Sequence, residues 1–118
     1  MEIRIDPASA TSLFEQVRAS ILAQVRSGEL IAETKIPTVR GLAEQLGIAP
    51  HTVARAYKEL EAQGVIEARG RLGTFIRSSG DPTEDNAARA AMAFVAELRA
   101  LGLSDDKIRG VLDSALDA

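Results

Sequence analysis

The chain has 118 residues, of which 46% are hydrophobic, and a formal net charge of −3. This length suits one compact domain, or a small domain with an appended element, and is too short for a large second domain. The absence of cysteine excludes disulfides and any zinc or redox site built on thiolates. Residues 1–7 lack the apolar core of a signal peptide, and no apolar run approaches the roughly 18 residues of a membrane span. We therefore expect a cytoplasmic protein with no membrane partner.

The first 28 residues predict a short strand and a helix. Residues 2–5 alternate between charged and apolar side chains before the break at Asp6-Pro7. Such a strand could extend a sheet of this chain or cross to a partner, and the sequence leaves both possibilities open. Residues 12–28 then carry apolar side chains at helical spacing and end in a glycine, which predicts a helix that packs behind those that follow. Its apolar positions are Leu13, Val17, Ile21, Leu22 and Val25.

Two short amphipathic helices separated by a tight turn are predicted next. The first has Thr38 as its N-cap and ends at Gly47, and the second begins at Pro50 and stops at Gly64. The apolar stripe of the first helix is Val39, Leu42, Ala43 and Leu46. The second buries Val53, Ala56, Tyr57 and Leu60. The side chains left outward on the second helix are donors of the kind that a recognition helix offers to bases and phosphates. These are His51, Thr52, Arg55 and Lys58.

A glycine-bearing β-hairpin follows directly. Residues 65–69 and 74–77 have the character of strands, and the intervening Gly70-Arg71-Leu72-Gly73 allows a tight reversal. An arginine at such a tip can reach a phosphate or the minor groove of DNA. Two helices followed by a hairpin predict a mainly α-helical fold with a small β-hairpin wing, the winged helix-turn-helix, over residues 1–79.

The charge is divided unevenly along the chain. Residues 35–77 contain seven basic and four acidic side chains, a net charge of +3, whereas residues 80–118 contain four basic and eight acidic ones, a net charge of −4. Phosphate binding depends on the local field within a Debye length of roughly 8 Å, so the segment matters more than the total. We expect the acidic segment to point away from DNA.

Residues 80–118 predict a helical hairpin that serves as a dimerisation tail. Helical spacing over residues 86–101 is stopped by Gly102, and Ser104 then suits the N-cap of a last helix. A hairpin of this size lies below the roughly 40 residues that normally bury their own core, so it needs another surface, most simply the same hairpin of a second chain. A ligand pocket along the same stripe is the alternative. The candidate dimerisation residues are Ala91, Met92, Val95, Leu98, Ile108, Val111, Leu112 and Leu116.

The residues from Leu13 to Arg77 resemble the N-terminal domain of GntR-family bacterial transcription regulators. The resemblance rests on residues 35–43, 47–60 and 64–76, and the string 49–61 is similar to the YtrA-type branch of the family. It implies DNA contact by Arg40 from the first helix of the motif, by Thr52 and Arg55 from the recognition helix, and by residues 70–74 from the wing. It also implies a short helical dimerisation element where other members carry a large effector domain. Because Ala49 and His51 replace the asparagines usual in this branch, the base preference does not carry over.

The sequence thus predicts a sequence-specific transcription regulator with double-stranded DNA as its partner. The candidate DNA-binding residues are Lys35, Thr38, Arg40, His51, Thr52, Arg55, Lys58, Gly70, Arg71, Gly73 and Thr74. The resemblance implies a homodimeric repressor of a pseudo-palindromic operator, in its own operon or that of an ABC transporter. The sequence leaves the operator, the regulated genes and any effector open.

Two other classes compete with this interpretation. An enzyme is disfavoured because the chain has no phosphate-binding loop, nucleophile elbow, cysteine nucleophile or His-Glu-x-x-His pair. With one histidine and no cysteine, we expect no metal site and no cofactor. The second competitor is a winged helix that binds protein without specific DNA binding, since fold alone does not fix function.

Overall fold

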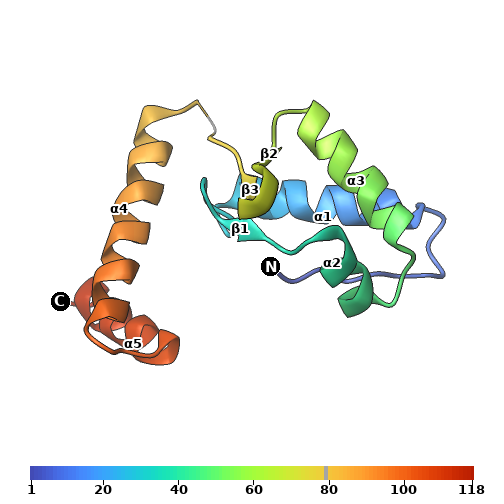
Figure 1. Ribbon diagram of the computed structural model, residues 1–118. Helices are drawn as coiled ribbons and strands as arrows, with labels where there is room; N and C mark the ends of the chain where they lie inside the picture. The colour runs from blue at the N-terminus through green and yellow to red at the C-terminus, as the bar shows by residue number, and fades with distance from the viewer. Residues whose placement is uncertain (79) are drawn as a thin grey trace. The chain divides into compact units, whose positions relative to one another are not determined.

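The computed structural model describes residues 1–78 and 80–118 and divides them into two units, Met1–Asp81 and Pro82–Ala118 (Figure 1). The first unit holds helices α1 (Leu13–Ser27), α2 (Val39–Leu46) and α3 (Pro50–Ala62) and strands β1 (Lys35–Ile36), β2 (Ile66–Ala68) and β3 (Thr74–Ile76). The second holds α4 (Pro82–Ala100) and α5 (Asp105–Leu116). The predicted mainly helical fold with a small wing is confirmed. Residue 79, where the sequence ends the first domain, lies outside the described residues.

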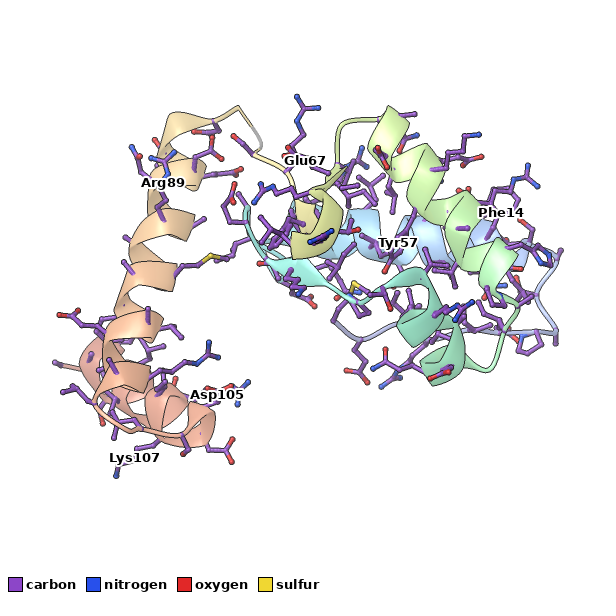
Figure 2. The ribbon with its side chains drawn as sticks, viewed as in Figure 1. Phe14, Tyr57, Glu67, Arg89, Asp105 and Lys107 are labelled. Carbon is purple, nitrogen blue, oxygen red and sulfur yellow. The ribbon has the colours of Figure 1, made fainter. Side chains whose placement is uncertain are left out.

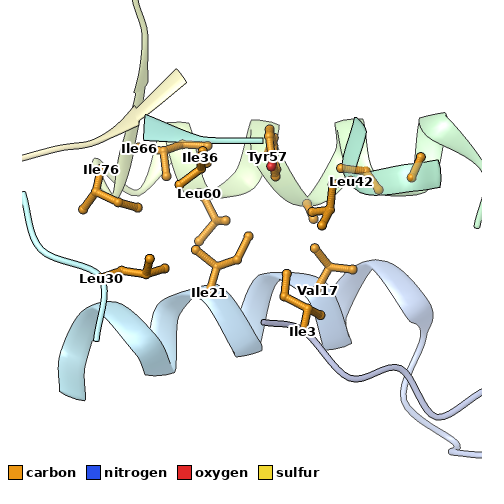
Figure 3. Close-up of a cluster of buried hydrophobic side chains, with 13 residues drawn as sticks. Ile3, Val17, Ile21, Leu30, Ile36, Leu42, Tyr57, Leu60, Ile66 and Ile76 are labelled. Carbon is orange, nitrogen blue, oxygen red and sulfur yellow. The ribbon is translucent and has the colours of Figure 1, made fainter. Parts of the chain in front are cut away.

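The core of the first unit gathers the apolar stripes of all three helices and the inner face of the sheet (Figure 3). Val17 and Ile21 of α1 meet Leu60 of α3 at its centre, and each is fully buried. Burying one such side chain stabilises the fold by about 1.5–3 kcal/mol. This packing fixes which face of α3 is turned to solvent.

The wing is a three-stranded antiparallel sheet with strand order β1-β3-β2, and not the two-stranded hairpin that the sequence predicts. Lys35 pairs with Phe75, and on the other side of β3 Glu67 pairs with the same residue. The two residues before Pro37 are too few to show a strand period, so only their pairing with a distant strand reveals β1. The sheet therefore holds the chain at both ends of the helix-turn-helix.

Residues 2–5 form no strand, which corrects the sequence-based expectation. Their backbone is held instead by side chains of α1, since Gln24 Nε2 donates to the carbonyl of Glu2 at 2.8 Å. About two turns earlier on α1, the Gln16 side chain accepts from the amide of Asp6 at 2.8 Å and donates to the carbonyl of Asp6 at 3.0 Å. Ile3 is buried in the core. The alternating pattern thus marks an extended segment anchored by an isoleucine and not a sheet edge.

The second unit is a hairpin of two helices. α4 begins at Pro82, four residues before the predicted start, and Ser104 caps α5 by accepting the amide of Lys107 at 3.2 Å. Arg99 of α4 donates from Nε to Asp105 Oδ1 of α5 at 3.0 Å, and this hydrogen bond lowers the pKa of Asp105. Within the described residues, no helix combines the length and apolar character needed to cross a bilayer.

Candidate nucleic-acid interface

Local capping and one partly buried hydrogen bond set the geometry of the helix-turn-helix. Thr38 Oγ1 accepts the amide of Gly41 at 3.0 Å at the start of α2, and Gly47 ends the helix in a left-handed conformation with φ 65°. Tyr57 is buried and its hydroxyl donates to the carbonyl of Pro37 at 2.7 Å. Burial raises the pKa of the Tyr57 phenol, which keeps it a neutral donor. α3 is thereby tied to the segment that enters α2.

The predicted DNA-binding residues of the two helices are on the outer surface. Arg40 of α2 is exposed, as are His51, Arg55 and Lys58 of α3, and Thr52 is half-buried. Thr38 is also exposed, with its oxygen engaged as the cap and its proton available to a second acceptor. The first turns of α3 therefore present the polar side chains that base edges and phosphates require.

The wing tip is a short 3-10 turn, Gly70–Leu72. It is closed by the amide of Gly73 donating to the carbonyl of Gly70 at 3.2 Å and the amide of Arg69 donating to the carbonyl of Gly73 at 2.8 Å. Arg71 is exposed beside Leu72, a leucine whose exposed fraction is 67%. Gly73 has φ 113°, and a Cβ there would lie 2.7 Å from Lys35 Cε. The side chain of Lys35 therefore lies directly against Gly73 at the wing tip.

The cations of the first unit fall into two groups. Arg18, Arg69 and Arg77 lie within 4.0 Å of carboxylates of this chain. Among residues 1–78 and 80–118, six cationic side chains have neither an ion pair nor a side-chain hydrogen bond. Two of them, Arg26 and Lys107, lie on α1 and α5. The other four are Lys35, Arg40, Lys58 and Arg71, which come from β1, α2, α3 and the wing. A phosphate contact by any of these four breaks no internal ion pair.

Arg69 is a wing residue to which the sequence assigns no role. Its Nη1 and Nη2 donate to the two carboxylate oxygens of Glu33 at 2.7 and 3.1 Å, and its Nε donates to Glu67 at 3.0 Å. These hydrogen bonds raise the pKa of Arg69. Its guanidinium carbon lies 4.5 Å from the centre of the Phe75 ring. Arg69 therefore fastens the base of the wing, and its partner Glu33 is too distant in sequence for any local pattern to show.

Arg55 is held differently from the four unpaired cations. Its guanidinium carbon lies 3.7 Å from the centre of the Phe14 ring on α1, and its Nε is 4.0 Å from Glu59 Oε1. The side chain is nevertheless 65% exposed. Phe14, labelled in Figure 2, is half-buried against the core and received no role from the sequence. The apolar spacing that places it on α1 gives no sign of a stacked arginine.

The predicted dimerisation residues vary in exposure. Ile108 is buried, whereas Ala91, Leu112 and Leu116 are exposed and the others are half-buried. A groove of about 230 Å³ between α4 and α5 is lined by Val95, Arg99, Asp105, Ile108, Arg109 and Leu112. Within the described part of the chain, no three His, Cys, Asp or Glu side chains converge on a metal position.

Comparison with known proteins shows which family the chain resembles. Residues 13–76 match the model of the family described as bacterial regulatory proteins, gntR family. The chain is 50% identical over 102 residues to the HTH-type transcriptional regulator Rv1152 of Mycobacterium tuberculosis, covering 86% of this chain and 84% of that protein. It is 42% identical over 81 residues to the HTH-type transcriptional repressor YtrA of Bacillus subtilis, covering 69% of this chain and 62% of YtrA.

A solved structure adds a nucleic-acid context. This chain is similar to the AraR DNA-binding domain in complex with operator ORX1, with a TM-score of 0.56, 29% identity, and coverage of 64% of this chain and 95% of that one. The helix-turn-helix and wing described above thus share their fold with a domain seen on its operator. Together with the family match over residues 13–76, these likenesses show that the chain belongs to the GntR family of bacterial regulatory proteins.

Proposed function

We propose that this chain is a cytoplasmic repressor that binds a pseudo-palindromic operator as a homodimer. The observation that carries the proposal is the set of four unpaired cations, Lys35, Arg40, Lys58 and Arg71, on the same elements that form the helix-turn-helix and wing. Each phosphate neutralised by such a cation releases counterions, which supplies affinity independent of base sequence.

Base recognition falls to the first turns of α3. His51, Thr52 and Arg55 lie there and offer an imidazole, a hydroxyl and a guanidinium to base edges in the major groove. The wing supplies a second set of contacts from Gly70, Arg71, Gly73 and Thr74, with Arg71 suited to a phosphate or the minor groove. Contacts from His51, Thr52 and Arg55 set specificity, and contacts from Arg40, Lys58 and Arg71 set position.

We propose that the helical tail, residues 80–118, forms the dimer. This unit is too small to bury a core of its own, and it leaves Leu112 and Leu116 exposed, the latter by 81%. Two copies would place two recognition helices on half-sites one helical turn apart. Repression is supported by the likeness to the transcriptional repressor YtrA. We propose the operon of this chain, or one for an ABC transporter, as the target.

Fluorescence anisotropy on the duplex upstream of the chain's own gene, with a scrambled duplex as competitor at several salt concentrations, tests DNA binding. A preference of about 10³-fold or more is expected for a specific regulator. Arg40→Gln should weaken binding to both duplexes, whereas Arg109→Gln, at an exposed arginine of α5, serves as the matched control and should not. Binding to neither duplex would instead favour a protein-interaction module.

Sedimentation tests the assembly separately. Leu116→Glu should shift the chain from dimer to monomer because it places a charge in the proposed interface. Leu72→Glu is the matched control, since it places the same charge at another highly exposed leucine, which lies in the wing. A dimer that survives Leu116→Glu together with Leu112→Glu would refute this interface.

A further inference from the structure

Arg55 and Arg69 are two arginines stacked on phenylalanine rings, and their donors are used in opposite ways. Arg69, over Phe75, gives hydrogen bonds from all three of its nitrogens to Glu33 and Glu67. Arg55, over Phe14, gives no hydrogen bond to any described residue. Every nitrogen of Arg69 is engaged by a carboxylate, whereas no nitrogen of Arg55 donates a hydrogen bond to a described residue.

The carboxylate beside Arg55 accepts no hydrogen bond from the Arg55 guanidinium. Glu59 Oε1 is 4.0 Å from Arg55 Nε, at the limit of an ion pair, and the other oxygen of Glu59 faces Arg18 Nε at 3.8 Å. Arg18 is held in turn by hydrogen bonds to Glu15 of the same helix. Glu59 is thus shared between two arginines, and the Arg55 guanidinium lies over the Phe14 ring at 3.7 Å from its centre.

A ring in this position restricts the orientation of the guanidinium but leaves its hydrogen-bond donors unoccupied. Stacking engages the flat face of the group and leaves its N–H edge free, which is the edge used for bidentate bonds to guanine or phosphate. A free arginine loses much rotamer freedom on binding, and a pre-oriented one loses less. The exposed fraction of 65% at Arg55 fits a side chain covered on one face only.

We propose that Phe14 is a positioning residue for DNA recognition, which holds the guanidinium of Arg55 in the orientation that reads the operator. The inference rests on the proposed function and adds α1, which otherwise only packs, to the specificity apparatus. Phe14 itself touches no DNA. Its effect passes entirely through Arg55.

A double-mutant cycle on the full chain tests this. The probe is a duplex that the wild-type protein enriches from a random-sequence library, and the variants are Phe14→Leu, Arg55→Ala and the two combined. From the usual strength of a cation–π contact, Phe14→Leu should raise the Kd by about 3- to 30-fold in the wild-type background. In the Arg55→Ala background it should raise the Kd by less than about 2-fold. Phe14→Tyr, which keeps the ring, should restore wild-type affinity.

A matched variant distinguishes weaker binding caused by a general loss of stability from weaker binding caused by loss of the Phe14–Arg55 contact. Val25→Ala trims another half-buried residue of α1 that packs on the same core but does not touch Arg55, and its melting temperature and Kd are measured alongside. The expected result is that Val25→Ala lowers the melting temperature and shows no dependence of its Kd effect on Arg55.

Three outcomes would overturn the proposal. An equal rise in Kd from Phe14→Leu in both backgrounds would make the ring merely structural. Tighter binding by Phe14→Leu would mean that the ring withholds Arg55 from DNA. A library from which the wild-type chain enriches no duplex would overturn the proposed function and this inference with it, whereas the first two outcomes leave the proposed function intact.

Discussion

Replacing Tyr57 by phenylalanine probes the side-chain hydrogen bond that joins α3 to the segment entering α2. The substitution keeps the buried ring and removes only the hydroxyl that donates to the Pro37 carbonyl at 2.7 Å. A net hydrogen bond contributes about 0.5–1.5 kcal/mol, and an acceptor left unsatisfied adds to the loss. Because Pro37 is only half-buried and water can reach it, we expect the free energy of unfolding to fall by about 1–1.5 kcal/mol.

The Tyr57 phenol also leads to a prediction of how the free energy of unfolding depends on pH. Burial raises the pKa of Tyr57 above its ordinary value of 10.0. A group whose pKa is higher in the folded state gives its full stabilisation below the unfolded pKa and loses it as the pH rises further. The advantage of the wild type over Tyr57→Phe should therefore hold up to about pH 10 and shrink above it.

Urea unfolding followed by circular dichroism measures the first effect, at neutral pH and again above pH 10. Ultraviolet absorbance of tyrosinate measures the second, because Tyr57 is the sole tyrosine of the chain. Two results would refute the reasoning: an unfolding free energy of Tyr57→Phe within about 0.3 kcal/mol of wild type, or a phenol that ionises at its ordinary pKa while the protein is folded.

Three further predictions concern the cap, the tip and the base of the DNA-binding unit. Thr38→Val removes the oxygen that caps α2 and should cost about 1 kcal/mol in urea unfolding; no loss would mean that water caps the helix equally well. Arg71→Ala should reduce the slope of log Kd against log salt by about 1 while leaving the specificity ratio unchanged, and a changed ratio would assign Arg71 to base reading. Glu33→Gln weakens the hold on Arg69, so hydrogen exchange at the amide of Ile76 should accelerate while that in the centre of α1 does not; uniform acceleration would contradict a local clamp.

The helices follow from the sequence because their signals are local. Thr38, Gly47 and Ser104 mark helix ends within a few residues of the apolar stripes that they bound, and the structure places all three as predicted. The third strand and the N-terminal segment do not follow. β1 is two residues long and depends on Phe75 and Thr74 far along the chain, while the alternation of residues 2–5 suits an anchored loop as well as a strand.

The candidate interface likewise combines features that the local sequence predicts with features that depend on distant residues. The sequence identifies which cations lie on the helix-turn-helix and wing, because position on an amphipathic helix predicts exposure. It does not reveal which cations are already neutralised. Arg69 and Arg71 are two residues apart with similar surroundings in sequence, yet one is bonded to Glu33 across 36 positions and the other is unpaired. Ion pairing of this kind depends on the folded arrangement.

The register of β1 against β3 has a practical consequence. Lys35 and Glu67 both pair with Phe75, from opposite sides of β3. The chain therefore leaves the sheet at β1, forms α2 and α3, and returns at β2, two strand spacings or roughly 10 Å away. Exchanging residues 37–64 between two relatives that share the α1 side chains beneath α3 should thus transfer the recognition helix as one block and give hybrid regulators with the parental wing tip and tail.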